Sequence, residues 1–94
     1  MASIIEGDFE WDDAKAAANL TKHEVTFEEA ATVFDDPRAI DAPDLESDER
    51  FVIIGRSSLS RVLFVEHCER GDRVRIISAR VASLAQRRVY DEGT

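Results

Sequence analysis

Three arginines in the second half of the chain are placed to form one cationic row. We expect three consecutive antiparallel strands there: Phe51–Arg56, Arg61–His67 and Arg73–Arg80. With a four-residue loop and then a two-residue turn between them, Arg56, Arg61 and Arg80 lie side by side at one end of the sheet. Like charges opposite each other on adjacent strands repel, so an anion must balance such a row.

The balancing anion could be a ligand, and the phosphodiester of RNA is one whose cleavage such a row could assist. Attack of a 2′-OH on phosphorus builds negative charge on the phosphoryl oxygens, and each well-placed guanidinium stabilises it by on the order of a few kcal/mol. Arg80 is the first candidate for this role, with Arg61 beside it and Arg56 orienting the neighbouring phosphate. The alternative is that these arginines pair with the protein's own carboxylates or cap exposed strand ends.

Proton transfer and further RNA contacts have candidates elsewhere in the chain. Lys22 and His23 close the first predicted helix and could act as general acid or base, although a C-terminal helix cap explains His23 equally well. Arg87 and Arg88 make the last predicted helix basic and suited to bind RNA. Tyr90 could stack on a base or donate a proton, and a packed aromatic is the alternative.

Size and composition predict one globular domain over residues 1–94, and its predicted strands and helices place it in the α+β class. Hydrophobic residues make up 44% of the 94, and the lone Cys68 excludes an intrachain disulfide and fits a reducing compartment. We expect a cytoplasmic protein without a membrane span or secretory signal. The net charge is −8, made of −11 in residues 1–50 and +3 in residues 51–94, so the two halves can also neutralise each other.

Helix and strand signals position these candidates. Asp12 is a predicted N-cap for the first helix, and Thr26 and Glu29 match a capping box for the second. Ser83 and Gln86 occupy capping-box positions before the last helix. The remaining predicted elements are a first strand at Phe9–Asp12, helices at Asp13–His23 and Ser83–Tyr90, a second helix that ends before Asp36-Pro37, and a polar loop at Asp41–Arg50.

The predicted sheet register depends on the turn chosen for the last hairpin. A two-residue turn at Arg70-Gly71 places Glu66 opposite Arg75, an attractive pair that supports this choice, but a slip of one residue would dissolve the arginine row. His67 lies six residues along its strand from Arg61, roughly 20 Å, so we expect it to be structural. No zinc spacing or calcium loop is present, and we expect no metal and no cofactor.

The chain resembles the BrnT family of type II toxin–antitoxin systems over nearly its whole length. The matching residues are Phe9-Glu10-Trp11-Asp12, Lys15, Asn19, Lys22-His23, Val25, Phe27-Glu28, Ala30, Phe34, Asp36-Pro37, Glu49-Arg50, Ile54-Gly55, Arg61, Arg75-Ile76-Ile77-Ser78-Ala79-Arg80, Arg87 and Tyr90. The family usually has glycine where Glu24 stands and commonly has it at Ser60.

The resemblance implies a RelE-like fold and a ribonuclease activity. The fold would be a short N-terminal strand, two helices, an antiparallel meander of three to four strands and a C-terminal helix. The activity would be metal-independent cleavage of RNA, held inactive by a BrnA-type antitoxin that alone contacts the operator DNA. A different class of function is an interaction module of the same fold, without catalysis, that only forms the antitoxin and operator complex.

Overall fold

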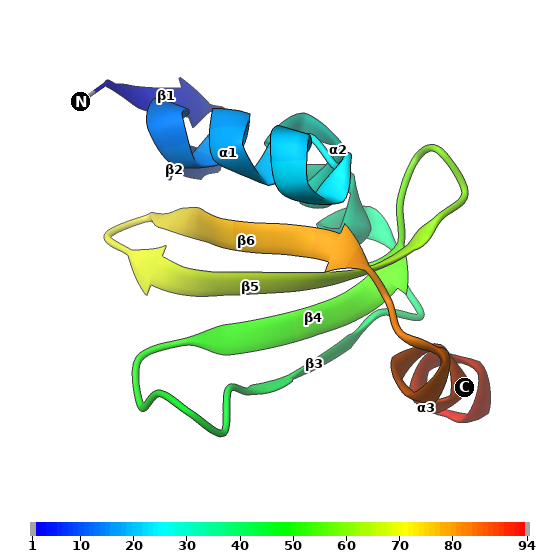
Figure 1. Cartoon of the computed structure of the whole chain (residues 1–94). Helices are drawn as coiled ribbons and strands as arrows, with labels where there is room; N and C mark the ends of the chain where they lie inside the picture. Colours follow the sequence, from blue (N-terminus) through cyan, green and yellow to red (C-terminus); the bar gives the residue numbers. More distant parts are fainter. Residues whose placement is uncertain (1, 94) are drawn as a thin grey trace.

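A six-stranded mixed sheet in the order β1-β2-β6-β5-β4-β3 carries α1 and α2 on one face and α3 on the other (Figure 1). The computed structural model describes residues 2–93. No helix within this range is long and apolar enough to cross a membrane. The elements are β1 (Ser3–Glu6), β2 (Phe9–Asp12), α1 (Asp13–His23), α2 (Phe27–Thr32) with a 3-10 turn η1 (Val33–Asp35), β3 (Ile40–Pro43), β4 (Phe51–Arg56), β5 (Val62–Arg70), β6 (Arg73–Val81) and α3 (Leu84–Glu92).

The sheet confirms the predicted strand–helix–helix–meander–helix order and extends it at both edges. Strands β3, β4, β5 and β6 form an antiparallel meander, as expected. Two strands were missed: β1, which pairs with β2, and β3, which begins the stretch predicted to be a polar loop. The sheet is mixed rather than antiparallel throughout, because β2 runs parallel to β6, with Phe9 opposite Val74 and Glu10 opposite Arg75.

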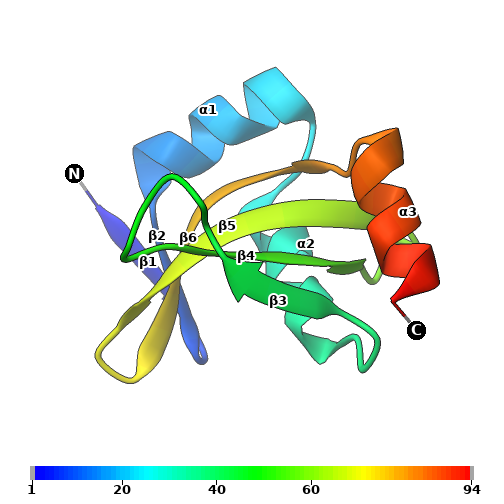
Figure 2. The ribbon, with the colours of Figure 1, turned by 90° about the horizontal axis from the view of Figure 1, so that it is seen from below.

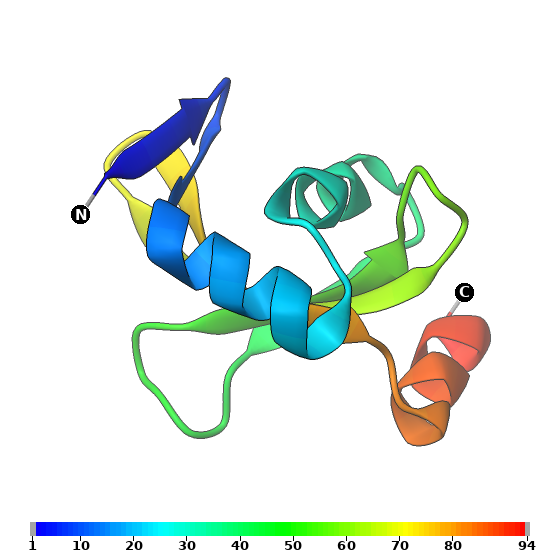
Figure 3. The ribbon, with the colours of Figure 1, turned by 45° about the horizontal axis from the view of Figure 1, so that its top comes forward.

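Local signals position the helices well. Helix α1 has the predicted bounds, and the Asp12 side chain accepts from the Lys15 amide at 2.9 Å. Thr26 accepts from the Glu29 amide at 3.0 Å, but the Glu29 side chain does not return to Thr26 as the capping box predicted. Before α3, Ser83 and Gln86 form the complete capping box. Figure 3 shows α1 leaving the N-terminal hairpin and running towards the end of the molecule that carries α3.

The main core lies between the sheet and the two helices above it. Trp11 meets Phe27 edge-on at 6.0 Å, and both are fully buried. Asn19 on α1 is buried, and its side chain forms hydrogen bonds with both the N–H and the C=O of Ala79. Because a buried amide needs partners, this contact ties α1 to β6 in one register. A smaller cluster of Ile54, Val62 and Tyr90 packs α3 against the opposite face.

Both predicted hairpin registers are wrong, and the arginine row does not form. The β5–β6 turn uses Gly71 and Asp72 instead of Arg70 and Gly71, and a bulge at Glu66/His67 shifts the pairing again. The β4–β5 connection has five residues rather than four, so Arg56 lies opposite Val62. A one-residue slip moves a side chain to the other face.

Two non-glycine residues within residues 2–93 adopt left-handed backbone conformations that favour glycine. Glu24, which ends α1, has φ 57°, and Ser60, in the β4–β5 loop, has φ 65°. Residues with a Cβ pay a steric cost in this region, which glycine avoids. These are the two positions where the family resemblance led us to expect glycine.

Candidate functional site

One end of the sheet collects basic side chains from several elements, and we call this region the basic end. Strand β4 ends there, β5 begins there, β6 leaves it for α3, and α1 ends above it (Figure 2). It comprises six of the twelve Lys and Arg residues of the chain, namely Lys22, Arg56, Arg61, Arg80, Arg87 and Arg88. The structure therefore gathers the predicted residues at one end, but on two faces of the sheet.

Arg61 lies on the face of α1 and α2 and is held by a buried carboxylate. Its Nε donates to Glu29 Oε2 at 3.0 Å and its Nη2 donates to Glu29 Oε1, while Nη2 also donates to the Glu24 carbonyl at 3.1 Å. The Ser57 hydroxyl donates to the same carboxylate at 2.6 Å. The hydrogen bonds from Arg61 lower the pKa of Glu29 despite its burial, so the pair is ionised. The alternative of pairing with the protein's own carboxylates applies to Arg61.

Arg80 lies on the opposite face and is half-buried. Its guanidinium carbon stands 4.5 Å above the centre of the Phe64 ring, which lies opposite it on β5. Its Nη1 donates to the Gln86 side chain at 3.1 Å, which links it to the first turn of α3. No carboxylate pairs with Arg80 within residues 2–93. A guanidinium that lies over a ring and donates to a single neutral acceptor is positioned and keeps donors for an anion.

Arg56 and Tyr90 share this face with Arg80 at the edge of α3. The Arg56 side chain is exposed and donates to the Ser60 carbonyl at 3.3 Å. The Tyr90 hydroxyl donates to Asp36 Oδ2 at 2.7 Å, and the Arg56 amide donates to the same oxygen at 2.8 Å. Burial and the bond to Asp36 raise the pKa of Tyr90, which is 3% exposed. The packed-aromatic alternative thus describes Tyr90, and its hydroxyl holds α3 in place.

The other predicted residues lie at the rims of the basic end. Lys22 is exposed and His23 is half-buried at the end of α1, one turn beyond Asn19, which binds β6. The Arg61 guanidinium donates to the carbonyl of Glu24, the residue that follows His23. Arg87 and Arg88 are exposed on α3. Lys22 and His23 therefore neighbour Arg61, whereas Arg87 and Arg88 accompany Arg80.

Comparisons with known proteins identify the family. The family model described as "Ribonuclease toxin, BrnT, of type II toxin-antitoxin system" matches residues 11–85. The chain belongs to the BrnT family. The crystal structure of the Brucella abortus ribonuclease toxin BrnT is similar, with a TM-score of 0.65 and 25% sequence identity, over 78% of this chain and 92% of that one. A search of curated proteins finds no match. The predicted family and α+β fold are thus confirmed.

The match to the BrnT family covers the basic end unevenly. It includes Arg56, Arg61 and Arg80 together with the end of α1, but stops at residue 85, in the first turn of α3. Arg87, Arg88 and Tyr90 therefore fall outside the matched region. The match thus covers the part of the basic end that is built on the sheet, and it leaves most of α3 uncovered.

Sequence reasoning missed Glu29 and Ser57, the residues that hold Arg61. Glu29 was assigned to a helix cap, and no local pattern links it to an arginine 32 residues away. The one available signal is that Glu29 precedes Ala30 and Ala31 on a short helix beside the core, where a buried carboxylate would need a cationic partner. Within the described residues, no group of three or more His, Cys, Asp or Glu side chains is arranged to hold a metal ion.

Proposed function

We propose that this chain is an endoribonuclease toxin that cleaves RNA without a metal ion. The 2′-oxygen forms a bond to the adjacent phosphorus as the bond to the 5′-oxygen breaks; one proton leaves the 2′-OH and another reaches the 5′-oxygen. The supporting observation is Arg80, a guanidinium positioned on Phe64 at the basic end with no carboxylate partner within residues 2–93. Arg80 stabilises the charge on the phosphoryl oxygens.

The remaining predicted residues take different parts in this proposal. Arg56, Arg87 and Arg88 bind neighbouring phosphates, since they are exposed on the face of Arg80 or on α3. Arg61 supports the architecture that presents the end of α1, because its hydrogen bonds to Glu29 occupy the fork that would otherwise bind phosphate. Proton transfer falls to Lys22 or His23 at that helix end, which requires the scissile phosphate to lie across the end of the sheet, between its two faces.

The experiment compares two arginine-to-alanine variants with equal charge loss. Purified wild-type protein, R80A and R73A are incubated with a fluorescent RNA in EDTA, and cleavage rates are measured. Arg73 is exposed beside the β5–β6 turn, at the opposite end of β6 from Arg80. We expect R80A to lose about 100- to 1,000-fold in rate and R73A to stay within about twofold.

The melting temperature of R80A shows whether the variant remains folded. A folded R80A that cleaves RNA at the wild-type rate contradicts the role of Arg80. Loss of cleavage by the wild-type protein in EDTA, with recovery on adding Mg²⁺, contradicts the metal-free mechanism.

The second candidate function is a non-catalytic interaction module that only forms the antitoxin and operator complex. The observation that favours it is the ion pair of Arg61 with Glu29, which removes one guanidinium from phosphate binding, in a chain of net charge −8. Robust RNA cleavage by the purified protein in EDTA excludes this function. The absence of growth arrest on expression without antitoxin supports it.

We propose that a BrnA-type antitoxin neutralises this chain by covering Phe64 and Arg80, and that the chain reaches operator DNA only through the antitoxin. An apolar hollow of about 520 Å³, lined by Leu45, Val52 and Phe64 among others, adjoins the ring that carries Arg80. A partner seated in it blocks the guanidinium. We expect L45D to weaken antitoxin binding at least about tenfold, whereas I5D, at an exposed apolar residue of β1, does not. Equal binding of both variants contradicts this surface.

A further inference from the structure

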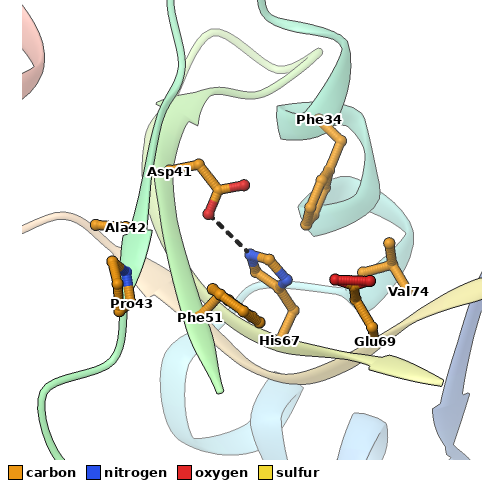
Figure 4. Close-up of a pocket in the computed structure, with 8 residues that line it drawn as sticks. All are labelled: Phe34, Asp41, Ala42, Pro43, Phe51, His67, Glu69 and Val74. Atoms are coloured by element: carbon orange, nitrogen blue, oxygen red, sulfur yellow. Dashed lines mark ion pairs between the residues drawn. The ribbon is translucent and has the colours of Figure 1, made fainter. Parts of the chain in front are cut away.

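A second pocket lies on the α2 face of the sheet, at the far end of β5 from Arg61 (Figure 4). It has a volume of about 420 Å³, within the range of small-molecule sites. His67 projects into it from β5, between Phe34 of η1 and Phe51 of β4. Six residues of strand separate His67 from Arg61, roughly 20 Å, so this His67 pocket is distinct from the basic end.

His67 is buried yet has unused hydrogen-bonding groups. The residue is 5% exposed, and neither ring nitrogen has a hydrogen-bond partner within residues 2–93. Its ring stacks on Phe51 at 6.0 Å and meets Phe34 edge-on at 4.9 Å, so the imidazole is held in one orientation. Buried polar atoms are nearly always satisfied, so one that faces a pocket indicates a ligand that would satisfy it.

Two carboxylates give the pocket a negative charge. Asp41 Oδ1 stands 3.7 Å from His67 Nε2, and Glu69 lines the same pocket. Burial lowers the pKa of His67, although both carboxylates oppose that shift, so the imidazole is neutral at neutral pH and offers a ring nitrogen as acceptor. Neither carboxylate has an arginine or lysine partner within the described residues. No arginine or lysine of the described residues therefore neutralises the charge of this pocket.

We propose that the His67 pocket binds an organic cation, a guanidinium or ammonium group on an aliphatic stem. The charged group would lie between Asp41 and Glu69 and donate to His67, with Phe34 and Phe51 offering ring faces. Val74 and the other apolar lining would contact the stem. A bare metal ion fits poorly, since these side chains do not converge as a metal site. The same chemistry could come from a free amine or from a Lys or Arg side chain of a protein.

The test uses n-butylguanidinium as the probe and n-butylurea as its neutral isostere. Titrations are followed by NMR through the imidazole signals of His67, with His23 as the internal control in the same spectrum. We expect saturable shifts at His67 with a dissociation constant of about 1 mM, as suits a small fragment. We expect no shift at His23 and at least about tenfold weaker binding of n-butylurea.

Two matched variants test the role of charge without disturbing the core. Asp41 has a side chain 57% exposed, so D41N should fold normally and bind the probe about three- to tenfold more weakly. D48N, in the exposed loop before β4, should bind like wild type. Putrescine and an end-blocked Gly-Gly-Arg-Gly-Gly peptide then distinguish the two sources of the cation. Tighter binding of putrescine indicates a free amine, and tighter binding of the peptide indicates a protein side chain.

Three results would overturn the proposal. The first is no saturable shift at His67 with any cationic probe. The second is equal binding of n-butylguanidinium and n-butylurea, which would make the pocket simply apolar. The third is D41N binding as tightly as D48N, which would remove the carboxylate from recognition.

Discussion

Replacing Arg61 should damage folding more than it damages the chemistry. R61A removes both hydrogen bonds to Glu29, whose side chain is only 5% exposed, and leaves that carboxylate without its cation. Breaking a buried pair costs about 3–5 kcal/mol. The Arg61 side chain is 35% exposed and Ser57 still donates to Glu29, so partial solvation reduces our figure to about 2–3 kcal/mol. This corresponds to a melting temperature lower by about 10–20 °C.

Urea unfolding of R61A, E29Q and the double variant measures this coupling. We expect a coupling energy of about 2 kcal/mol, because the amide of E29Q removes the stranded charge. The control is R50A, which breaks an exposed pair with Glu66 at 3.4 Å and should cost less than about 1 kcal/mol. If R61A costs no more than R50A, or if the cycle is additive, Arg61 is free for phosphate and our assignment is wrong.

The pH dependence of this pair has a definite sign. The Arg61 hydrogen bonds lower the native pKa of Glu29 below its usual 4.5. The unfolded chain therefore binds the proton first as the pH falls, and the stability contributed by the pair is complete only above pH 4.5. This contribution to stability is lost as the pH falls through the lowered pKa of Glu29 in the folded protein. E29Q should lack this part of the acid destabilisation in urea titrations at different pH values.

Three further predictions concern stability. E24G and S60G should each raise the free energy of unfolding by about 0.5–1 kcal/mol in thermal melts, since glycine relieves the left-handed strain and the backbone hydrogen bonds remain. Burial lowers the native pKa of His67, so the unfolded chain takes the proton first below pH 6.5; stability should fall there, and H67N should remove that slope in urea titrations. Y90F loses the 2.7 Å bond to Asp36, so it should cost about 1 kcal/mol and speed amide exchange in α3.

A matched variant separates these effects from general perturbation. S58G lies in the same loop as Ser60 but without a positive φ, so it should lower stability. A gain in stability from S58G, or an unchanged slope in H67N, would contradict the reasoning.

The helices were predictable because their signals are local. Asp12, Thr26 and Ser83 each cap the helix that follows within three residues, so chain neighbours alone decide those boundaries. The strand register was not predictable in the same way. It depends on one extra residue in the β4–β5 loop and on a bulge at Glu66/His67, and neither feature has a marker in the residue pattern.

The candidate site was predicted in its residues but not in its arrangement. Arg80 and Arg56 share a face, as expected. Arg80 lies opposite Phe64, which lies opposite Ile54, and Arg56 is two residues from Ile54 on the same strand. Because the β4–β5 register differs by one residue from the prediction, Arg61 lies on the other face. There it binds Glu29, which is distant in the sequence. Pairings across such separations depend on tertiary packing, which a single sequence does not display.

The parallel pairing of β2 with β6 has a consequence for synthesis on the ribosome. Phe9 and Glu10 are made early, yet their partners Val74 and Arg75 emerge only when most of the chain has been translated. The hydrogen bonds of Asn19 likewise cannot form before Ala79 has been synthesised. The core therefore cannot be completed before residues 74–79 have been synthesised, so packing of the N-terminal segment depends on the strand that also carries Arg80.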